Sequence, residues 1–105
     1  MKYSKEHFRK TQKLIKDAAT KVIVESSSQS KMRRVAKLAK IKINYVKYLS
    51  KEYALIIKKN KGNNSDKNLK LSVINETIDI ILKSSSSREM KRAVDLAIAK
   101  LRLFK

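Results

Sequence analysis

The chain has 105 residues and a formal net charge of +18, because 27 Lys and Arg stand against nine Asp and Glu. It holds no cysteine, so disulfides and thiolate metal sites are excluded. A single glycine and the absence of proline argue against sandwiches and barrels, which need many tight turns. With 42% apolar residues, a chain of this length is expected to form one all-α domain with its own core.

The first expected helix spans about residues 5–24. Phe8, Ile15 and Val22 fall seven residues apart and therefore share one face. A run of serines at 26–28 follows, and serine side chains compete for backbone hydrogen bonds in a way that ends helices. The sequence thus predicts a helix that stops at a serine turn.

The longest expected helix begins after that turn and reaches Asn60 without glycine or proline. Its apolar side chains recur in steps of three and four and form two adjacent lines, which predicts a central helix packed against neighbours on two sides. The first line is Met32, Val35, Ala39, Val46, Leu49, Tyr53 and Ile56, and the second is Leu38, Ile41, Tyr45, Tyr48 and Leu55. Lys42 interrupts the first line. A brief apolar alternation over residues 41–45 leaves a short strand as the alternative there.

A loop at 60–68, with the only glycine at Gly62, separates a first hairpin (5–59) from a second one (69–105). The third helix is expected to start near Ser65 or Asp66 and to reach Lys83. Apolar side chains share one face of each remaining helix: Leu71, Ile74, Ile78 and Ile81 on the third, and Met90, Val94, Ala97, Leu101 and Phe104 on the fourth.

The two hairpins share a pattern at a spacing of 58 residues. This shift aligns Ser26, Met32, Arg34 and Leu38 with Ser84, Met90, Arg92 and Leu96. Ser26 with Gln29, and Ser86 with Glu89, match capping boxes at the starts of the second and fourth helices. Duplication and chance similarity both remain open. Either one predicts a small four-helix bundle of two helix–serine turn–helix hairpins.

Enzymatic chemistry finds little support. His7 is the one histidine and has no carboxylate at a diagnostic spacing. Glu76 and Asp79 lie three apart, but the abundant lysines favour solvated charges over a cation site. No glycine-rich loop can hold a phosphate, and no base accompanies the serine runs. We therefore expect a protein that is not an enzyme, with no catalytic residue, metal, cofactor or small-molecule substrate.

The positive charge is the feature that predicts function. Residues 1–60 carry 17 Lys or Arg against four acids (+13), and residues 61–105 carry ten against five (+5). Such a chain attracts polyanions, and counterion release drives backbone binding without base readout. The expected phosphate contacts are Arg33, Arg34, Lys37, Lys40, Lys47, Lys51, Arg88, Lys91 and Arg92. Both groups follow a serine run, so N–H groups at two helix starts are expected to face phosphates beside them.

The aromatic residues and the known readout motifs add little to this prediction. Tyr45, Tyr48 and Tyr53 fall on the apolar lines and are expected in the core, which leaves Tyr3 as the exposed candidate for stacking on bases. No recognition-helix or zinc-finger pattern is present, so binding is expected to be independent of base sequence.

In size, four-helix organisation and basic face, the chain resembles the small helical subunits of CRISPR effector complexes. The residues that carry this are Arg33, Arg34, Lys37 and Lys40 on the long helix, with Arg88, Lys91 and Arg92. The resemblance implies antiviral defence and binding of a guide RNA–target duplex or a displaced strand, together with other subunits or copies of itself. Segments 14–22 and 69–82, with the long helix between them, are similar to the histone fold, which implies histone-like or viral packaging of duplex DNA.

The rival classes are a membrane-surface protein and a purely structural scaffold. Basic amphipathic helices bind anionic lipid, but four helices with matched apolar faces can bury one another. No apolar run reaches membrane-spanning length, and the N-terminus lacks the apolar centre of a signal peptide. We therefore expect little membrane association and a cytoplasmic protein, or one packed inside a virion.

Overall fold

The computed structural model describes residues 4–59 and 67–103. These residues form four helices, α1 (Ser4–Glu25), α2 (Gln29–Lys59), α3 (Lys67–Lys83) and α4 (Ser87–Leu103), and the described part contains no strand. The all-α prediction is confirmed, and the strand alternative at 41–45 is wrong because these residues lie within α2. Four predicted features lie outside the described residues, namely Tyr3, the Gly62 loop, a helix start at Ser65 or Asp66, and Phe104.

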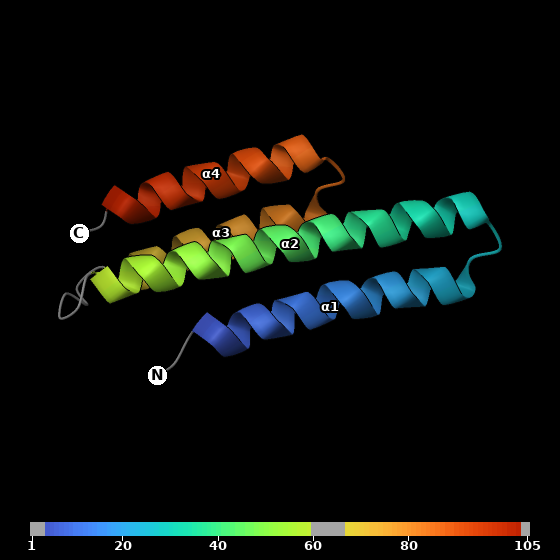
Figure 1. Ribbon diagram of the computed structural model, residues 1–105, viewed down its shortest axis with the longest axis horizontal. Helices are drawn as coiled ribbons and strands as arrows, with labels where there is room; N and C mark the ends of the chain where they lie inside the picture. Colours follow the sequence, from blue (N-terminus) through green and yellow to red (C-terminus); the bar gives the residue numbers. More distant parts are fainter. Residues whose placement is uncertain (1–3, 60–66, 104–105) are drawn as a thin grey trace.

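The helices form two antiparallel hairpins, α1 with α2 and α3 with α4 (Figure 1). α2 is the central helix, because it contacts α1 along its length and also packs against α4 and α3. The molecule is elongated, with extents of 53 × 27 × 17 Å. Both serine turns point towards the same end of it, and the second turn lies well short of the first (Figure 1). No described helix has the length and apolar content to cross a membrane.

The buried core lies where the two hairpins overlap, away from the first serine turn. It consists of Phe8, Ile15, Val46, Leu49, Tyr53, Ile56, Ile74, Ile78, Ile81, Met90, Val94, Ala97, Ile98 and Leu101. The predicted apolar faces of α3 and α4 are therefore confirmed, except that Leu71 is only half-buried. Each fully buried large apolar side chain stabilises the fold by about 1.5–3 kcal/mol.

The first hairpin extends past the second, because α2 has 31 residues whereas α3 and α4 have 17 each (Figure 1). We call residues 16–42 the hairpin tip. None of them is fully buried. The turn-proximal half of the first apolar line on α2, namely Met32, Val35 and Ala39, is consequently half-buried. The apolar pattern continues to the far end of the tip, but the second hairpin covers only the base of the tip.

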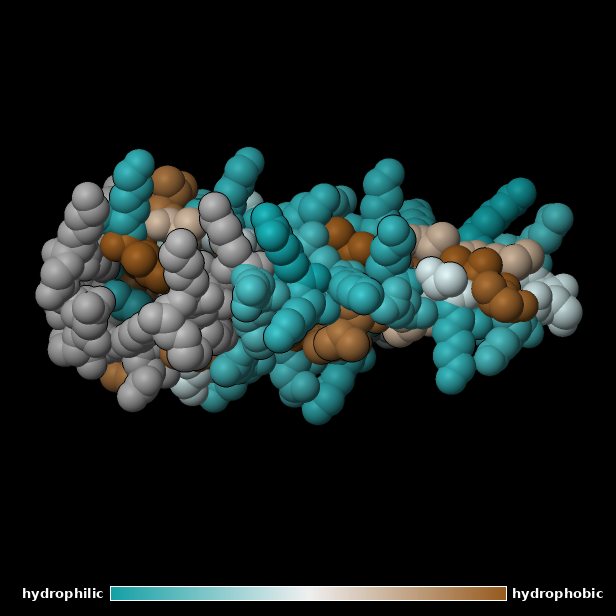
Figure 2. All heavy atoms as spheres, turned by 90° about the horizontal axis from the view of Figure 1, so that it is seen from below, coloured by the Kyte–Doolittle hydropathy of each residue, from teal (hydrophilic) through white to brown (hydrophobic). Residues whose placement is uncertain are grey.

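The second apolar line on α2 is only partly right as a prediction. Leu38, Ile41 and Tyr45 pack against the core, whereas Tyr48 is 45% exposed and Leu55 is 53% exposed. At 3.6 residues per turn, Tyr48 and Leu55 lie about 120° round α2 from the centre of the buried line, beyond the reach of the neighbouring helices. Exposed apolar patches of this kind are scattered among hydrophilic side chains on the face shown in Figure 2.

The two serine turns share one hydrogen-bond pattern. Ser26 Oγ accepts from the N–H of Ser28 at 3.2 Å and donates to the carbonyl of Ser28 at 3.3 Å. Ser84 and Ser86 make the equivalent bonds at 3.0 and 3.1 Å. The first serine of each run therefore closes the turn upon the third.

The third serine of each run caps the following helix. Ser28 Oγ accepts from the N–H of Lys31, and Ser86 Oγ accepts from the N–H of Glu89, both at 3.3 Å. Ser86 is thus confirmed as the cap of α4. The capping box expected at Ser26 and Gln29 is wrong, because the Ser26 hydroxyl is used inside the turn and α2 begins only at Gln29.

Candidate nucleic-acid interface

Six basic residues form one line along α2, and we call this line the α2 stripe. Its members are Arg33, Lys37, Lys40, Lys47, Lys51 and Lys58, and all are exposed. At 3.6 residues per turn the stripe lies opposite the buried line of Val46, Leu49 and Tyr53. From Arg33 to Lys51 it covers about 27 Å of helix. Burial of one side of α2 thus fixes a row of cations on the other.

The start of α2 gathers three of the predicted residues around one hollow. Arg33, Arg34 and Lys37 line this space of about 510 Å³ together with Gln29 and Ser30. The three cations come within one turn of helix, so their repulsion favours an anion between them.

A neighbouring hollow of about 440 Å³ brings the second serine turn next to the same cluster. Arg34 and Lys37 line it from α2, Ser85 lines it from the second turn, and Ser87 lines it as the first residue of α4. The structure therefore joins the first basic cluster to the segment that immediately precedes Arg88.

The other predicted contacts are exposed but lie elsewhere. Lys47 and Lys51 continue the α2 stripe beyond both hollows, and Arg88, Lys91 and Arg92 lie on the exposed side of α4. Lys91 also pairs with Asp95 at 3.7 Å. The nine residues therefore form a stripe with a cluster at one end and a separate group on α4.

The α2 stripe has no compensating acid within the part of the chain that the structure describes. The ion pairs there join Lys83 to Asp79 at 3.0 Å, Lys91 to Asp95 at 3.7 Å and Arg102 to Glu52 at 3.8 Å. None includes a stripe residue. The positive potential of the stripe is therefore available to an external anion.

The helix starts contribute less than the sequence suggested. The N–H groups of Lys31 and Glu89 donate to the hydroxyls of Ser28 and Ser86. At each helix start, one N–H group that was expected to face phosphate is therefore already hydrogen-bonded within the protein. The side-chain cations are the main candidate contacts for phosphate that remain.

Tyr48 is a residue that the sequence interpretation assigned to the wrong side of α2. Its side chain is exposed and it stands between Lys47 and Lys51 in the sequence, next to the stripe. An exposed aromatic ring among cations is the arrangement with which single-strand binders stack bases. The exposure of Tyr48 could have been predicted from the sequence, because Tyr48 does not belong to the first apolar line of α2.

The remaining candidate groups show no metal site. Within the described ranges, no three His, Asp or Glu side chains gather in a way that could hold an ion. Asp79 pairs with Lys83, and His7 is half-buried edge-on to Phe8, with ring centroids 6.1 Å apart.

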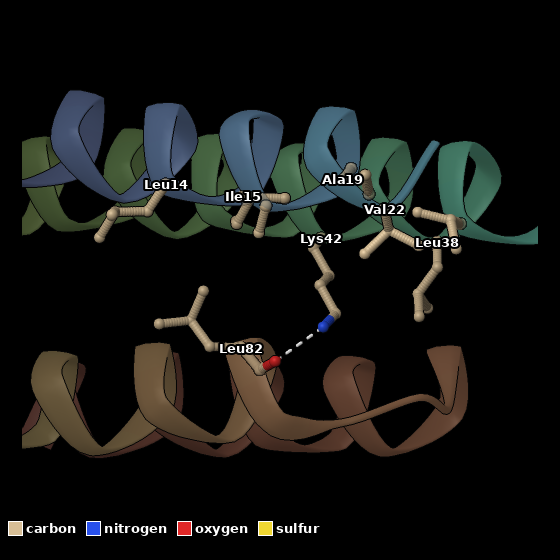
Figure 3. Close-up of a pocket in the computed structure, with 10 residues that line it drawn as sticks. Leu14, Ile15, Ala19, Val22, Leu38, Lys42 and Leu82 are labelled. Atoms are coloured by element: carbon tan, nitrogen blue, oxygen red, sulfur yellow. Dashed lines mark hydrogen bonds between the residues drawn. The ribbon is translucent and has the colours of Figure 1, made fainter. Parts of the chain in front are cut away.

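Lys42 occupies a second feature that the sequence did not predict, an apolar groove on the hairpin tip (Figure 3). Its Nζ donates to the carbonyl of Leu82 at 2.7 Å, in the last turn of α3. Carbonyls at a helix C-terminus lack partners within the helix and carry partial negative charge, so they suit an ammonium group. Burial lowers the pKa of Lys42 below its usual 10.5. Lys42, which interrupts the first apolar line, therefore lies beside the C-terminal end of α3.

Comparisons of the chain with protein-family models, with curated proteins and with solved structures found no match.

Proposed function

We propose that this protein is a non-enzymatic, sequence-independent binder of nucleic-acid backbone and that it acts as one subunit of a nucleoprotein assembly. The observation that supports this best is the α2 stripe, a row of exposed cations held opposite the core and without ion pairs among the described residues. The cluster of Arg33, Arg34 and Lys37 at its end is the strongest local contact for phosphate.

The stripe predicts how strongly binding depends on salt. If six cations contact phosphates, the logarithm of the affinity falls against the logarithm of salt with a slope of about −5 for duplex DNA and about −4 for a single strand. Affinity should then drop by roughly 10³ for duplex between 50 and 200 mM salt. No base contact is needed for this.

Tyr48 favours unpaired strands as the ligand. Its ring lies beside the cations of the stripe, where a base splayed from a strand can stack on it. In a duplex the bases are stacked on one another, so the ring would contribute nothing. We therefore propose single-stranded RNA or DNA as the preferred ligand.

The elongated shape and the length of the stripe fit a subunit that lies along a strand. We propose a setting like that of the small helical subunits of CRISPR effector complexes, with other subunits or copies of itself as neighbours, in the cytoplasm. Packaging of duplex DNA, in a histone-like or viral role, is the alternative that the ligand preference separates from this.

The test is a competition binding assay with single-stranded RNA, single-stranded DNA and duplex DNA across a salt series. We expect the steep salt dependence for all three and the tightest binding to a single strand. A clear duplex preference would favour the packaging role. A flat salt response, or binding to anionic vesicles without binding to any oligonucleotide, would contradict the proposal.

A further inference from the structure

We propose that the apolar groove of the hairpin tip docks an acidic amphipathic helix of a partner protein. The groove has a volume of about 430 Å³ and lies between the first hairpin and the end of α3. Its lining contains no residue of the α2 stripe, although Lys37 of the stripe lines the adjoining hollow. The proposal rests on the apolar lining of the groove and does not depend on nucleic-acid binding.

The apolar side chains of the groove are partly exposed because the second hairpin does not extend over them. Ala18 and Val22 line it from α1, and Val35 and Leu38 line it from α2. Leu14, which precedes the tip on α1, and Leu82 complete the lining. Figure 3 shows Leu14, Val22 and Leu38 on the side of the first hairpin that faces α3. Leu14 is 62% exposed although it carries a large apolar side chain. Burial of this apolar surface by a partner would be favourable.

The geometry of the bundle indicates that the occupant is a helix. In the packed part of the molecule α3 and α4 cover the apolar face of α2, and the same face continues into the tip through Val35, Leu38 and Ala39. A helix laid along the groove would extend the bundle by the same packing. From Leu14 to Val22 the floor measures about 12 Å, which accommodates roughly two turns of a partner with apolar residues at every third or fourth position.

The charge around the groove selects the chemistry of that helix. Lys42 is the one charged residue of the lining, and Lys31, Arg34 and Lys37 line the adjoining hollow, which shares Val35 and Leu38 with the groove. Neither lining contains an acid. A helix with Glu or Asp beside its apolar stripe would therefore meet cations at its edges.

A second copy of this chain is a poorer occupant. The hairpin tip carries eight Lys or Arg against two acids, a net charge of +6, so two tips laid together would place like charges against one another. Charge complementarity favours an acidic partner over self-association.

The test uses a designed peptide of about 14 residues, with leucine at every third or fourth position and glutamate at most others. A second peptide of the same composition has the leucines spread around the helix. We expect the amphipathic peptide to bind at least about tenfold more tightly, because only it presents a continuous apolar face. Equal binding of the two peptides would overturn the proposal, since charge alone would then explain it.

Matched substitutions locate the site. Leu14→Glu and Val22→Glu introduce a carboxylate into the groove, and Leu96→Glu and Val24→Glu make the same change of charge at exposed positions outside it. We expect each groove variant to weaken peptide binding by at least about tenfold, because a carboxylate in an apolar contact is costly. Each control should stay within about twofold of the unaltered protein.

Further readouts identify a different occupant. The variants should keep their helical circular dichroism and their affinity for single-stranded oligonucleotide, so that a failure of this proposal is distinct from a failure of nucleic-acid binding. Groove-dependent binding to phosphatidylglycerol vesicles without peptide binding would overturn the proposal in favour of lipid. Self-association that is lost in Leu14→Glu, again without peptide binding, would overturn it in favour of a second copy.

Discussion

The two ends of α2 carry the same apolar period but differ in how deeply their apolar side chains are buried. Towards the interhairpin loop, Val46, Leu49, Tyr53 and Ile56 are buried beneath the second hairpin. Towards the first serine turn, Met32, Val35 and Leu38 are only half-buried, because the second hairpin covers only the base of the tip. One end therefore stabilises the fold, and the other presents an apolar groove beside exposed cations. Periodicity identifies the face of a helix that can be buried. The length and placement of the neighbouring helices decide how much of that face is buried.

The largest expected effect comes from truncating the same residue type at the two ends of α2. Leu49→Ala removes a side chain with 0% exposure and should lower the free energy of unfolding by about 2–5 kcal/mol. Leu38→Ala removes a half-buried side chain and should cost about 1 kcal/mol. Urea denaturation measures both. Equal losses would mean that the tip is as well packed as the core.

A smaller effect is expected on oligonucleotide binding, from substitutions on the exposed side of α2. Tyr48→Ala should weaken binding of a single-stranded oligonucleotide by about 1–3 kcal/mol, because a base loses its stacking partner. Tyr48→Phe keeps the ring and should keep the affinity. Leu55→Ala, at an equally exposed position without an aromatic ring, serves as the control. If Tyr48→Ala binds like the unaltered protein, stacking has no part in recognition.

The smallest expected effect concerns the buried tyrosine. Burial raises the pKa of Tyr53 above its usual 10.0. The unfolded chain therefore releases this proton at lower pH than the folded one, so the associated stability is complete below about pH 10 and is lost as the pH rises through the folded pKa. Tyr53→Phe should decline less in this alkaline window, as measured by urea denaturation at successive pH values. A decline identical to that of the unaltered protein would show that Tyr53 is solvated.

Helix positions and core residues were predictable because they follow from local spacing. The serine turns, the apolar lines of α3 and α4 and the exposed stripe on α2 all depend on residues within a few turns of one another. The cap of α2 was misplaced by two residues because consecutive serines compete for the same role, and only the fold decides between Ser26 and Ser28.

The remaining errors depend on contacts between segments far apart in the sequence. Tyr48 and Leu55 match the apolar pattern but lie beyond the reach of the neighbouring helices. Lys42 breaks the pattern because its partner is the carbonyl of Leu82, forty residues away. The groove depends on where the shorter second hairpin packs along the first, and local spacing does not encode that placement.

The central claim is that the α2 stripe and the cluster of Arg33, Arg34 and Lys37 at its end, rather than total charge, bind nucleic acid. It is tested most directly by the salt dependence of binding to a single-stranded oligonucleotide, measured for two variants of equal charge. One replaces Arg33, Arg34, Lys37 and Lys40 with glutamine, and the other replaces Lys10, Lys13, Lys16 and Lys21, which are exposed on α1. We predict that the salt slope falls in magnitude by about 3 in the first variant and by less than about 1 in the second. Equal slopes in the two variants would contradict the account.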